Sequence, residues 1–285
     1  NNIENLKLVQ GDVRNTNLLN KIIPGIDAII HLACISNDPS FELNPELGKS
    51  INLDAFKPLV KISKDNGVKR FIYASSSSVY GVKKKKNVFE HAALEPLTDY
   101  SKFKVYCEEI CLKYHSKNFE VVVLRPATVC GVSNRQRFDL VVNILTNLGY
   151  NKKKISVFGG NQLRPNIHIK DMVNSYLTVL QKKSFFKSEN VFNVGYENLS
   201  VIALANLVKK NLNQNIKIIK TASNDDRSYH ITSEKIKKEL GFVNKFNIED
   251  AINDLKRAFI NKRFQNPLNN KLYFNLQMMK FINLK

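Results

Sequence analysis

The apolar residues of the chain form short, unbroken runs separated by longer stretches of mixed polarity. Runs without polar alternation are typical of strands buried on both faces of a parallel sheet. Their lengths suit strands rather than helices or membrane spans. The predicted strands are Leu6–Val9, Asp27–Ala33, Phe71–Ser76, Val121–Leu124 and Val191–Gly195.

Two stretches between these runs have helical character. The first extends from about Pro45 to Asp65, and we expect Pro58 to kink it and Gly67 to end it. The second extends from about Thr98 to Ser116. Alternating strands and helices with short links favour right-handed crossovers and a parallel α/β sheet.

The pattern changes beyond Gly131, where strands become shorter and helices dominate. The tail from Arg263 is rich in Asn and has no clear period, so we expect it to be loosely docked. This change predicts a second, smaller α/β unit. Its predicted elements are the helices Phe138–Leu148, Ser200–Asn211 and Ile248–Asn261 and the strand Ile155–Phe158.

Candidate chemistry gathers between Phe71 and Lys104. The strand ends in four serines, and the next helix carries Tyr100 and Lys104 four residues apart, on one helical face. An ammonium near a phenol favours the phenolate, so we expect the pKa of Tyr100 to fall. Such a phenol can take a proton from an alcohol whose oxygen is held by Ser76. Each feature alone has plainer explanations, namely a solvated helix face and a serine-rich loop.

Taken together, the strand, the serines, Val79-Tyr80-Gly81 and the Tyr100–Lys104 pair resemble the extended short-chain dehydrogenase/reductase family. The resemblance is to its nucleotide-sugar epimerases, dehydratases and reductases, and it covers nearly the whole chain. It implies a Rossmann-like, doubly wound parallel sheet with a smaller α/β C-terminal substrate domain. It also implies catalytic roles for Ser76, Tyr100 and Lys104.

The resemblance further implies NAD or NADP as cofactor. Asp12 follows the first predicted strand, where the family's acidic residue accepts from the adenine amine; alternatively, Asp12 caps the helix that starts near Asn15. His31 is interpreted as a core residue without chemistry. The residues implied at the dinucleotide are Asp12, Val13, Leu32, Ala33, Asn52, Tyr100, Lys104 and Pro126.

One departure from the family is large. The eleven glycines are dispersed, and only Gly159 and Gly160 are adjacent, so the glycine-rich turn that cradles a pyrophosphate is not found. We therefore expect a sheet that lacks its first βαβ unit, and the function predicted here concerns the intact protein. The expected domains are 1–131 with 165–196 for the dinucleotide, and 132–164 with 197–285 for the substrate.

The substrate implied by the resemblance is a nucleoside-diphosphate sugar. Two guanidinium groups, Arg164 and Arg227, are expected to hold its diphosphate, because an arginine forks well onto such a group. His168 and Asp171 are expected to fix the segment and cap the next helix. The implied substrate residues are Ser76, Ser77, Thr128, Arg137, Arg164 and Arg227.

Several reactions of the family remain possible on these residues. Dehydratases carry Asp-Glu where this chain has Ser77 and Ser78, so 4,6-dehydration is disfavoured. The cysteine typical of 3,5-epimerases is also absent. C4 epimerisation through a 4-keto sugar is favoured over reduction of a 4-keto sugar, and a non-catalytic nucleotide-binding fragment is the rival from another class. Surface-polysaccharide precursors are the usual products, and pairing through the helices near Asn52 and Tyr100 would make a homodimer.

Bulk composition narrows the alternatives further. The net charge is +19, but the lysines are scattered and no arginine-rich arm or zinc spacing accompanies them, which argues against a nucleic-acid binder. The four cysteines form no Cys-x-x-Cys pair and have no histidine at zinc spacing, so no metal site is expected. No apolar run approaches a membrane span, and no secretory signal is found. These features predict a cytoplasmic enzyme.

Overall fold

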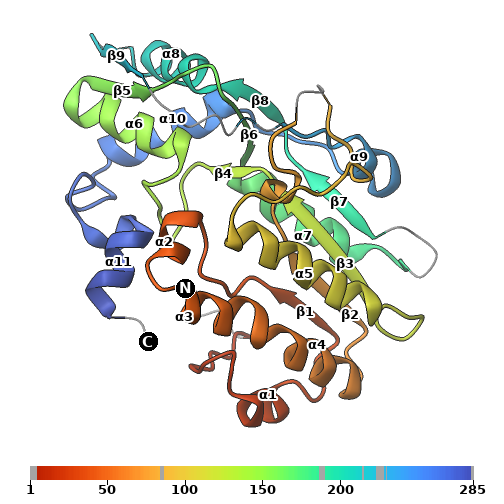
Figure 1. Cartoon of the computed structure of the whole chain (residues 1–285). Helices are drawn as coiled ribbons and strands as arrows, with labels where there is room; N and C mark the ends of the chain where they lie inside the picture. The colour runs from red at the N-terminus through yellow and green to blue at the C-terminus, as the bar shows by residue number, and fades with distance from the viewer. Residues whose placement is uncertain are drawn as a thin grey trace.

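A parallel four-stranded sheet lies at the centre of the first unit of the fold (Figure 1). The structure is a computed structural model, and it describes residues 5–83, 87–185, 190–213, 215–222, 228 and 230–283. All three pairings in this sheet are parallel, and its order is β1-β2-β3-β7. The strands are β1 (Ala28–His31), β2 (Arg70–Ala74), β3 (Glu120–Pro126) and β7 (Val191–Val194). The Rossmann-like α/β prediction is confirmed.

Helices cover both faces of this sheet. Alternate residues of β2 explain why: Phe71 packs with Phe56 and Cys107 on one face, whereas Ile72 packs with Met172 on the other. Burying both faces is what an unbroken apolar strand requires. The helices of the first face are α1 (Thr16–Ile22), α4 (Phe56–Asp65) and α5 (Asp99–Lys113), and those of the second are α7 (Ile169–Gln181) and α9 (Glu234–Leu240).

The second half of the chain adds two small sheets and a separate apolar core (Figure 1, upper left). One sheet has the order β4-β6-β8 and the other pairs β5 with β9. The amphipathic helices of this region close over them. The elements are β4 (Thr128–Cys130), β5 (Lys154–Phe158), β6 (Leu163–His168), β8 (Glu197–Ser200), β9 (Lys217–Thr221), α6 (Val141–Lys152), α8 (Val201–Leu212) and α10 (Ile248–Ile260). Among the described residues, no helix is long and apolar enough to cross a membrane.

Two predictions for the first 65 residues are wrong. Leu6–Val9 is not a strand, and Leu8 is 84% exposed; no described strand pairs with it, and β1 is the edge of its sheet. The helix predicted over Pro45–Asp65 is divided at Ser50–Asp54, where one π-helical turn separates α3 (Pro45–Lys49) from α4. Pro58 lies near the start of α4, where a missing backbone N–H matters little.

Side chains at the helix starts follow simple capping chemistry. Asn15 accepts from the backbone of Leu18 and caps α1, so the alternative in which Asp12 is the cap is wrong. His168 caps α7, as expected from the sequence. Asp171 accepts from the backbone N–H groups of Lys245 and Phe246, and so fixes the connection that leads to α10.

The C-terminal tail is docked, contrary to the expectation of a loose segment. It forms a short 3-10 turn at Lys271–Tyr273 and the helix α11 (Asn275–Ile282). The Tyr273 carbonyl accepts from the backbone N–H of Phe138, and the rings of these two residues also pack against each other. Asn and aromatic side chains thus attach the tail through specific contacts that leave no periodic signal in the sequence.

Candidate active site

Ser76, Tyr100 and Lys104 meet at the carboxyl end of the parallel sheet. Ser76 follows β2 and caps the 3-10 turn Ser77–Tyr80, whereas Tyr100 is the second residue of α5. The phenol of Tyr100 lies close enough to the Ser76 side chain for that hydroxyl to lower the phenol's pKa. A strand-end hydroxyl therefore lies beside a helix-borne phenol, which is the juxtaposition that the spacing predicts.

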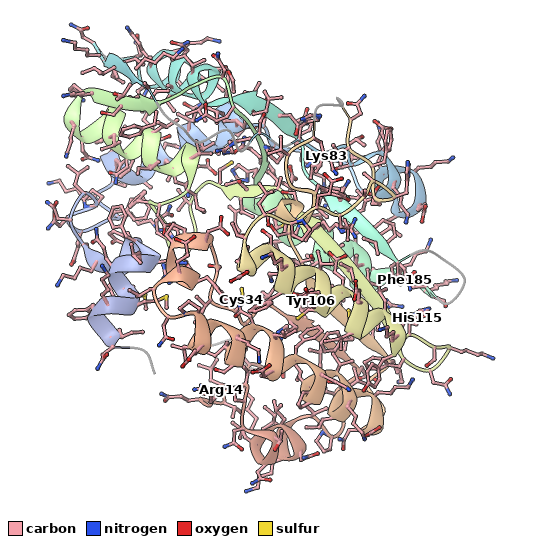
Figure 2. The ribbon with its side chains drawn as sticks, viewed as in Figure 1. Arg14, Cys34, Lys83, Tyr106, His115 and Phe185 are labelled. Carbon is pink, nitrogen blue, oxygen red and sulfur yellow. The ribbon has the colours of Figure 1, made fainter. Side chains whose placement is uncertain are left out.

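Lys104 lies beside Tyr100 and is held there by the backbone at the end of β2. Its ammonium donates to the carbonyl of Ala74 at 2.6 Å and lies 5.0 Å from the centre of the Tyr73 ring and 5.7 Å from that of Tyr100. The Cys34 thiol is 3.9 Å away, and Figure 2 labels this cysteine between the α3–α4 segment and α5. The lysine is held by a backbone oxygen and aromatic faces.

The predicted fall in the pKa of Tyr100 is therefore wrong for this structure. Burial raises the pKa of the Tyr100 phenol, and the nearby Cys34 and Asp38 raise it further. Arg137 and the Ser76 side chain act in the opposite direction and do not overcome burial. Desolvation disfavours the charged phenolate more than the neighbouring positive charge favours it.

Four of the residues assigned to the dinucleotide lie together. Ala33, Asn52, Tyr100 and Lys104 line one small cavity, along with Cys34. Asn52 is on the π-helical turn, and its amide binds both the N–H and the carbonyl of Ile35, at 2.8 and 2.9 Å. These bonds fix the loop that follows β1, in keeping with the frequent use of π-turns at functional sites.

The other residues assigned to the dinucleotide do not line this small cavity. Asp12 is paired with Arg14 at 2.6 Å, and this guanidinium lowers the pKa of its carboxyl; Val13 is half-buried beside it. Leu32, which follows β1, is 59% exposed. Pro126 ends β3, next to β7. His31 is buried among aromatic rings, and burial lowers its pKa to about 4, as suits a core residue without catalytic chemistry.

A second cavity, of about 510 Å³, lies between the two halves of the chain. It brings together Thr128 and Arg164, which the sequence assigned to substrate. It also adds Asn37, Asp38 and Asp139, which sequence reasoning missed. The stretch Asn37-Asp38-Pro39 has the composition of a turn, and nothing in its sequence marks it as part of a cavity wall.

Arg137 lies beside this cavity with two of its nitrogens engaged. It donates to Asp139 at 2.8 Å and to Ser36 at 3.2 Å. Its third nitrogen, Nη2, is buried without a hydrogen-bond partner among the described residues. Ser77 is only 3% exposed, and Arg227 lies outside the described residues. Of the predicted substrate residues, Arg137 thus retains an unused donor.

Behind the site lies a charged network that the sequence did not reveal. Glu108 of α5 pairs with Arg125 of β3 at 2.6 Å and accepts from the Ser75 hydroxyl. Arg125 also donates to the Tyr80 hydroxyl at 2.7 Å, and that hydroxyl donates to Asn193 at 2.7 Å. Charged partners this deeply buried require mutual hydrogen bonding.

Comparison with known proteins agrees with this geometry. The sequence profile of the NAD-dependent epimerase/dehydratase family matches residues 1–195. The chain belongs to this family. Because the match takes in the sheet, Ser76 and α5, membership rests on the segment that builds the site.

Named relatives of the family include epimerases. An uncharacterized UDP-glucose epimerase of Bacillus subtilis, YtcB, is 33% identical over 67% of this chain. The chain spans about 60% of the length of that protein. A UDP-glucose 4-epimerase of Lactobacillus helveticus is 26% identical over 71% of this chain and 68% of its own.

Solved structures of the family share the fold. The UDP-glucuronic acid 4-epimerase of Bacillus cereus, in complex with UDP-glucuronic acid and NAD, superposes with a TM-score of 0.79 at 25% identity. The match covers 90% of this chain and 82% of that one. The dTDP-glucose 4,6-dehydratase of Streptomyces venezuelae, with NAD bound, gives a TM-score of 0.81 at 22% identity and speaks for the fold alone.

Proposed function

We propose that this protein catalyses NAD(P)-dependent C4 epimerisation of a nucleoside-diphosphate sugar through a 4-keto intermediate. The observation that carries the proposal is the contact between Tyr100 and Ser76 at the strand ends. Tyr100 exchanges the proton of the sugar hydroxyl, and Ser76 orients its oxygen. Lys104 keeps the adjoining wall in place through Ala74.

Ala33, Asn52, Tyr100 and Lys104 line one small cavity after β1, and these are the residues that would hold the nicotinamide end of a dinucleotide. The cavity measures only about 10 Å³, so its side chains would have to move apart to admit the ring. When bound, the nicotinamide would accept a hydride from the sugar and return it to the keto sugar. The chain's own residues bind, orient and handle the proton.

The larger cavity suits a nucleoside-diphosphate sugar. Arg164 and Thr128 line it, and Arg137 adds a buried N–H donor beside it. A guanidinium in this position binds a diphosphate or an anionic sugar substituent. Arg227 remains part of the substrate proposal, and the division into a dinucleotide and a substrate domain is proposed with it.

Epimerisation is preferred over dehydration because of what surrounds Ser76. Ser77 and Ser78 follow it, and neither can act as the carboxylic acid or carboxylate needed to expel a 6-hydroxyl. Ser78 is instead hydrogen-bonded to Ser76. The relatives include both 4-epimerases and 4,6-dehydratases, so the preference rests on Ser77 and Ser78.

The test uses the full-length protein with NAD and a panel of UDP- and dTDP-sugars, followed by NMR of the sugar products. We expect a C4 isomer to form without net consumption of NAD. Tyr100→Phe should lower the rate by about 10²- to 10⁴-fold, because it removes the acid–base group. Stoichiometric use of NADPH on a 4-keto sugar would replace epimerase by reductase, and wild-type activity in Tyr100→Phe would refute both.

A homodimer is part of the same proposal. The outer face of α5 carries Tyr106, which is 47% exposed and is labelled in Figure 2. An exposed aromatic side chain on a long helix suits helix pairing between two copies. Light scattering of the full-length protein should give twice the monomer mass, and Tyr106→Glu should lower it.

A further inference from the structure

A third cavity, of about 420 Å³, opens beside α9, outside the candidate active site. It shares no lining residue with the 510 Å³ cavity or with the small cavity after β1. Its volume falls in the range of small-molecule sites, about 300–1,000 Å³. Its wall comes from the stretch after β7, the residues that lead into α9 and the connection that follows α9. No step of the proposed reaction uses these residues.

The ribbon of β6 and β8 separates this cavity from the 510 Å³ cavity. Asn198 of β8 lines the 420 Å³ cavity, whereas Arg164, which pairs with the next residue Leu199, lines the 510 Å³ cavity. Successive side chains of a strand point to opposite faces, so the two cavities lie on opposite sides of the ribbon. Figure 1 shows α9 to the right of these strands and α6 to the left. A ligand in one cavity thus leaves the other open.

Asn244 presents an unused donor at the 420 Å³ cavity. It lines the cavity, and its Nδ2 is buried without a hydrogen-bond partner among the described residues. The backbone beside it is fixed, because the N–H groups of Lys245 and Phe246 both donate to Asp171. A buried donor without an acceptor destabilises the folded protein. A ligand oxygen placed against Asn244 would remove that penalty.

Two hydroxyl groups of the same wall are also available. Thr232 donates its backbone N–H to the carbonyl of Val88 at 3.0 Å, but its hydroxyl bonds to no other described residue. The Ser233 Oγ accepts from the Gly195 N–H at 2.7 Å, which leaves the hydroxyl hydrogen for another acceptor. The wall therefore offers an amide and two hydroxyls to one ligand.

The remaining groups decide the charge of that ligand. Glu234 and Lys237 both line the cavity, are exposed, and form no ion pair within the part of the chain that the structure describes. An anion would gain from Lys237 and lose at Glu234, and a cation would do the reverse. A neutral hydroxyl group can donate to the carboxylate and accept from the ammonium. Tyr196, which is 52% exposed, adds an aromatic ring for an apolar ligand face.

We propose that the 420 Å³ cavity is a second saccharide site, which binds a neutral hexose apart from the reaction. A pyranose carries hydroxyls of both hydrogen-bonding roles around a ring whose C–H face is apolar. These are the features that Asn244, Thr232, the two charges and Tyr196 offer together. The hexose is either a free sugar or the end of a glycan. The site does not depend on which reaction the protein catalyses.

Saturation-transfer NMR on the full-length protein tests this, with UDP in excess to fill the 510 Å³ cavity. Glucose, glucuronate and glucosamine present one ring as a neutral, an anionic and a cationic ligand, and maltotriose presents the end of a glycan. We expect glucose to bind at least as tightly as either charged sugar. Tighter binding of maltotriose would assign a glycan end. Preference for a charged sugar, or no transfer to any of the four, would overturn the proposal.

Asn244→Leu is the decisive variant, because it keeps the size of the side chain and removes no hydrogen bond to a described residue. We expect glucose to bind about 5- to 10-fold more weakly, the effect of one lost hydrogen bond. Tyr196→Ala should weaken glucose binding by about 5-fold or more, through loss of apolar contact. Asn174→Leu is the matched control, since Asn174 of α7 is half-buried and does not line the cavity.

Wild-type glucose affinity in Asn244→Leu would overturn the site, and a thermal melt of each variant shows that the protein is folded. The outcome is separable from that of the proposed function. Glucose binding that Asn244→Leu weakens, in a protein inactive on every nucleotide sugar, would refute the epimerase and leave this site in place. An active epimerase that binds none of the four sugars with UDP present would do the reverse.

Discussion

The two halves of α5 face two different kinds of polar surroundings. Near its start, Ser101 belongs to a row of hydrogen-bonded hydroxyls formed by Ser76, Ser78, Ser101 and Thr98. Glu108, two turns later, instead faces the guanidinium of Arg125. A hydroxyl can exchange its donor and acceptor roles, but a buried carboxylate–guanidinium pair has fixed ones. The hydroxyls near the start of α5 can therefore change their proton positions, whereas the Glu108–Arg125 pair farther along the same helix cannot.

The comparison teaches where this fold keeps its rigidity. The pair of Glu108 and Arg125 joins α5 to β3, and Tyr80 extends the network to Asn193 of β7. Fixed charges behind the site hold the strand ends in place. The hydroxyls in front of it are then free to rearrange without moving the backbone.

Breaking the fixed pair should have the largest effect on stability. Glu108→Ala leaves Arg125, which is 5% exposed, as an unpaired buried charge. We expect the free energy of unfolding to fall by about 3–5 kcal/mol, measured by urea denaturation. Glu109→Ala, at the exposed neighbouring position, is the control and should change it by less than about 0.5 kcal/mol. A small loss in Glu108→Ala would show that the pair is not what holds the strands.

His31 is a third kind of buried polar group, one that burial keeps neutral, and we expect it to make the free energy of unfolding sensitive to acid. Burial lowers the pKa of His31 from 6.5 to about 4. Between these pH values the unfolded chain binds a proton that the folded chain does not. Stability is therefore unaffected above pH 6.5 and falls by about 3 kcal/mol on acidification to pH 4, at 1.36 kcal/mol per unit.

Replacing that histidine isolates its contribution. His31→Phe keeps an aromatic ring among Phe56 and Tyr73 and should remove about 3 kcal/mol of the acid-induced loss, measured by urea denaturation at pH 7 and pH 4. His91→Gln changes an exposed histidine and should leave the loss intact. Equal pH dependence in His31→Phe and wild type would contradict the assignment.

Removing one hydroxyl from the fixed network should have a medium effect. Tyr80→Phe takes away the group that accepts from Arg125 and donates to Asn193. Both partners are buried, so we expect a loss of about 2 kcal/mol in the free energy of unfolding. Tyr106→Phe, on the exposed face of α5, should cost far less. Comparable losses for the two variants would mean that the network adds little to stability.

The smallest expected change in stability is in the hydroxyl row itself. Ser101→Ala should lower the free energy of unfolding by about 1 kcal/mol, because its partners Ser78 and Thr98 keep other hydrogen bonds. Calorimetry measures this directly. A loss as large as that of Glu108→Ala would place the row among the rigid parts of the molecule and remove the contrast drawn above.

The sequence predicted the parallel sheet and the meeting of Ser76 with Tyr100 because both follow from local patterns. Unbroken apolar runs require burial on two faces, and a strand end followed by a helix brings its residues to one edge. Thr128 and Arg164, which the sequence assigned to substrate, line one cavity, and their role there stays a prediction.

Other features depend on tertiary distances that no local pattern records. The direction in which the Tyr100 pKa shifts depends on burial. The partner of Lys104 is a backbone carbonyl, which carries no sequence signal. Asp38 reaches Thr98 across 60 residues of chain. The strand expected at Leu6–Val9 failed for the same reason, since a strand requires a neighbour and its own composition does not supply one.

The docking of α11 ties this late segment of the chain to the 510 Å³ cavity through residues that also hold Arg137. Asn275 donates from its side chain to Ser36 at 3.0 Å and from its backbone to Asp139 at 2.9 Å, and these are the two residues that hold Arg137. Shortening the chain ahead of Asn275 would loosen both supports of that guanidinium together. The position of Arg137 is thus sensitive to trimming of the chain at a point 138 residues downstream.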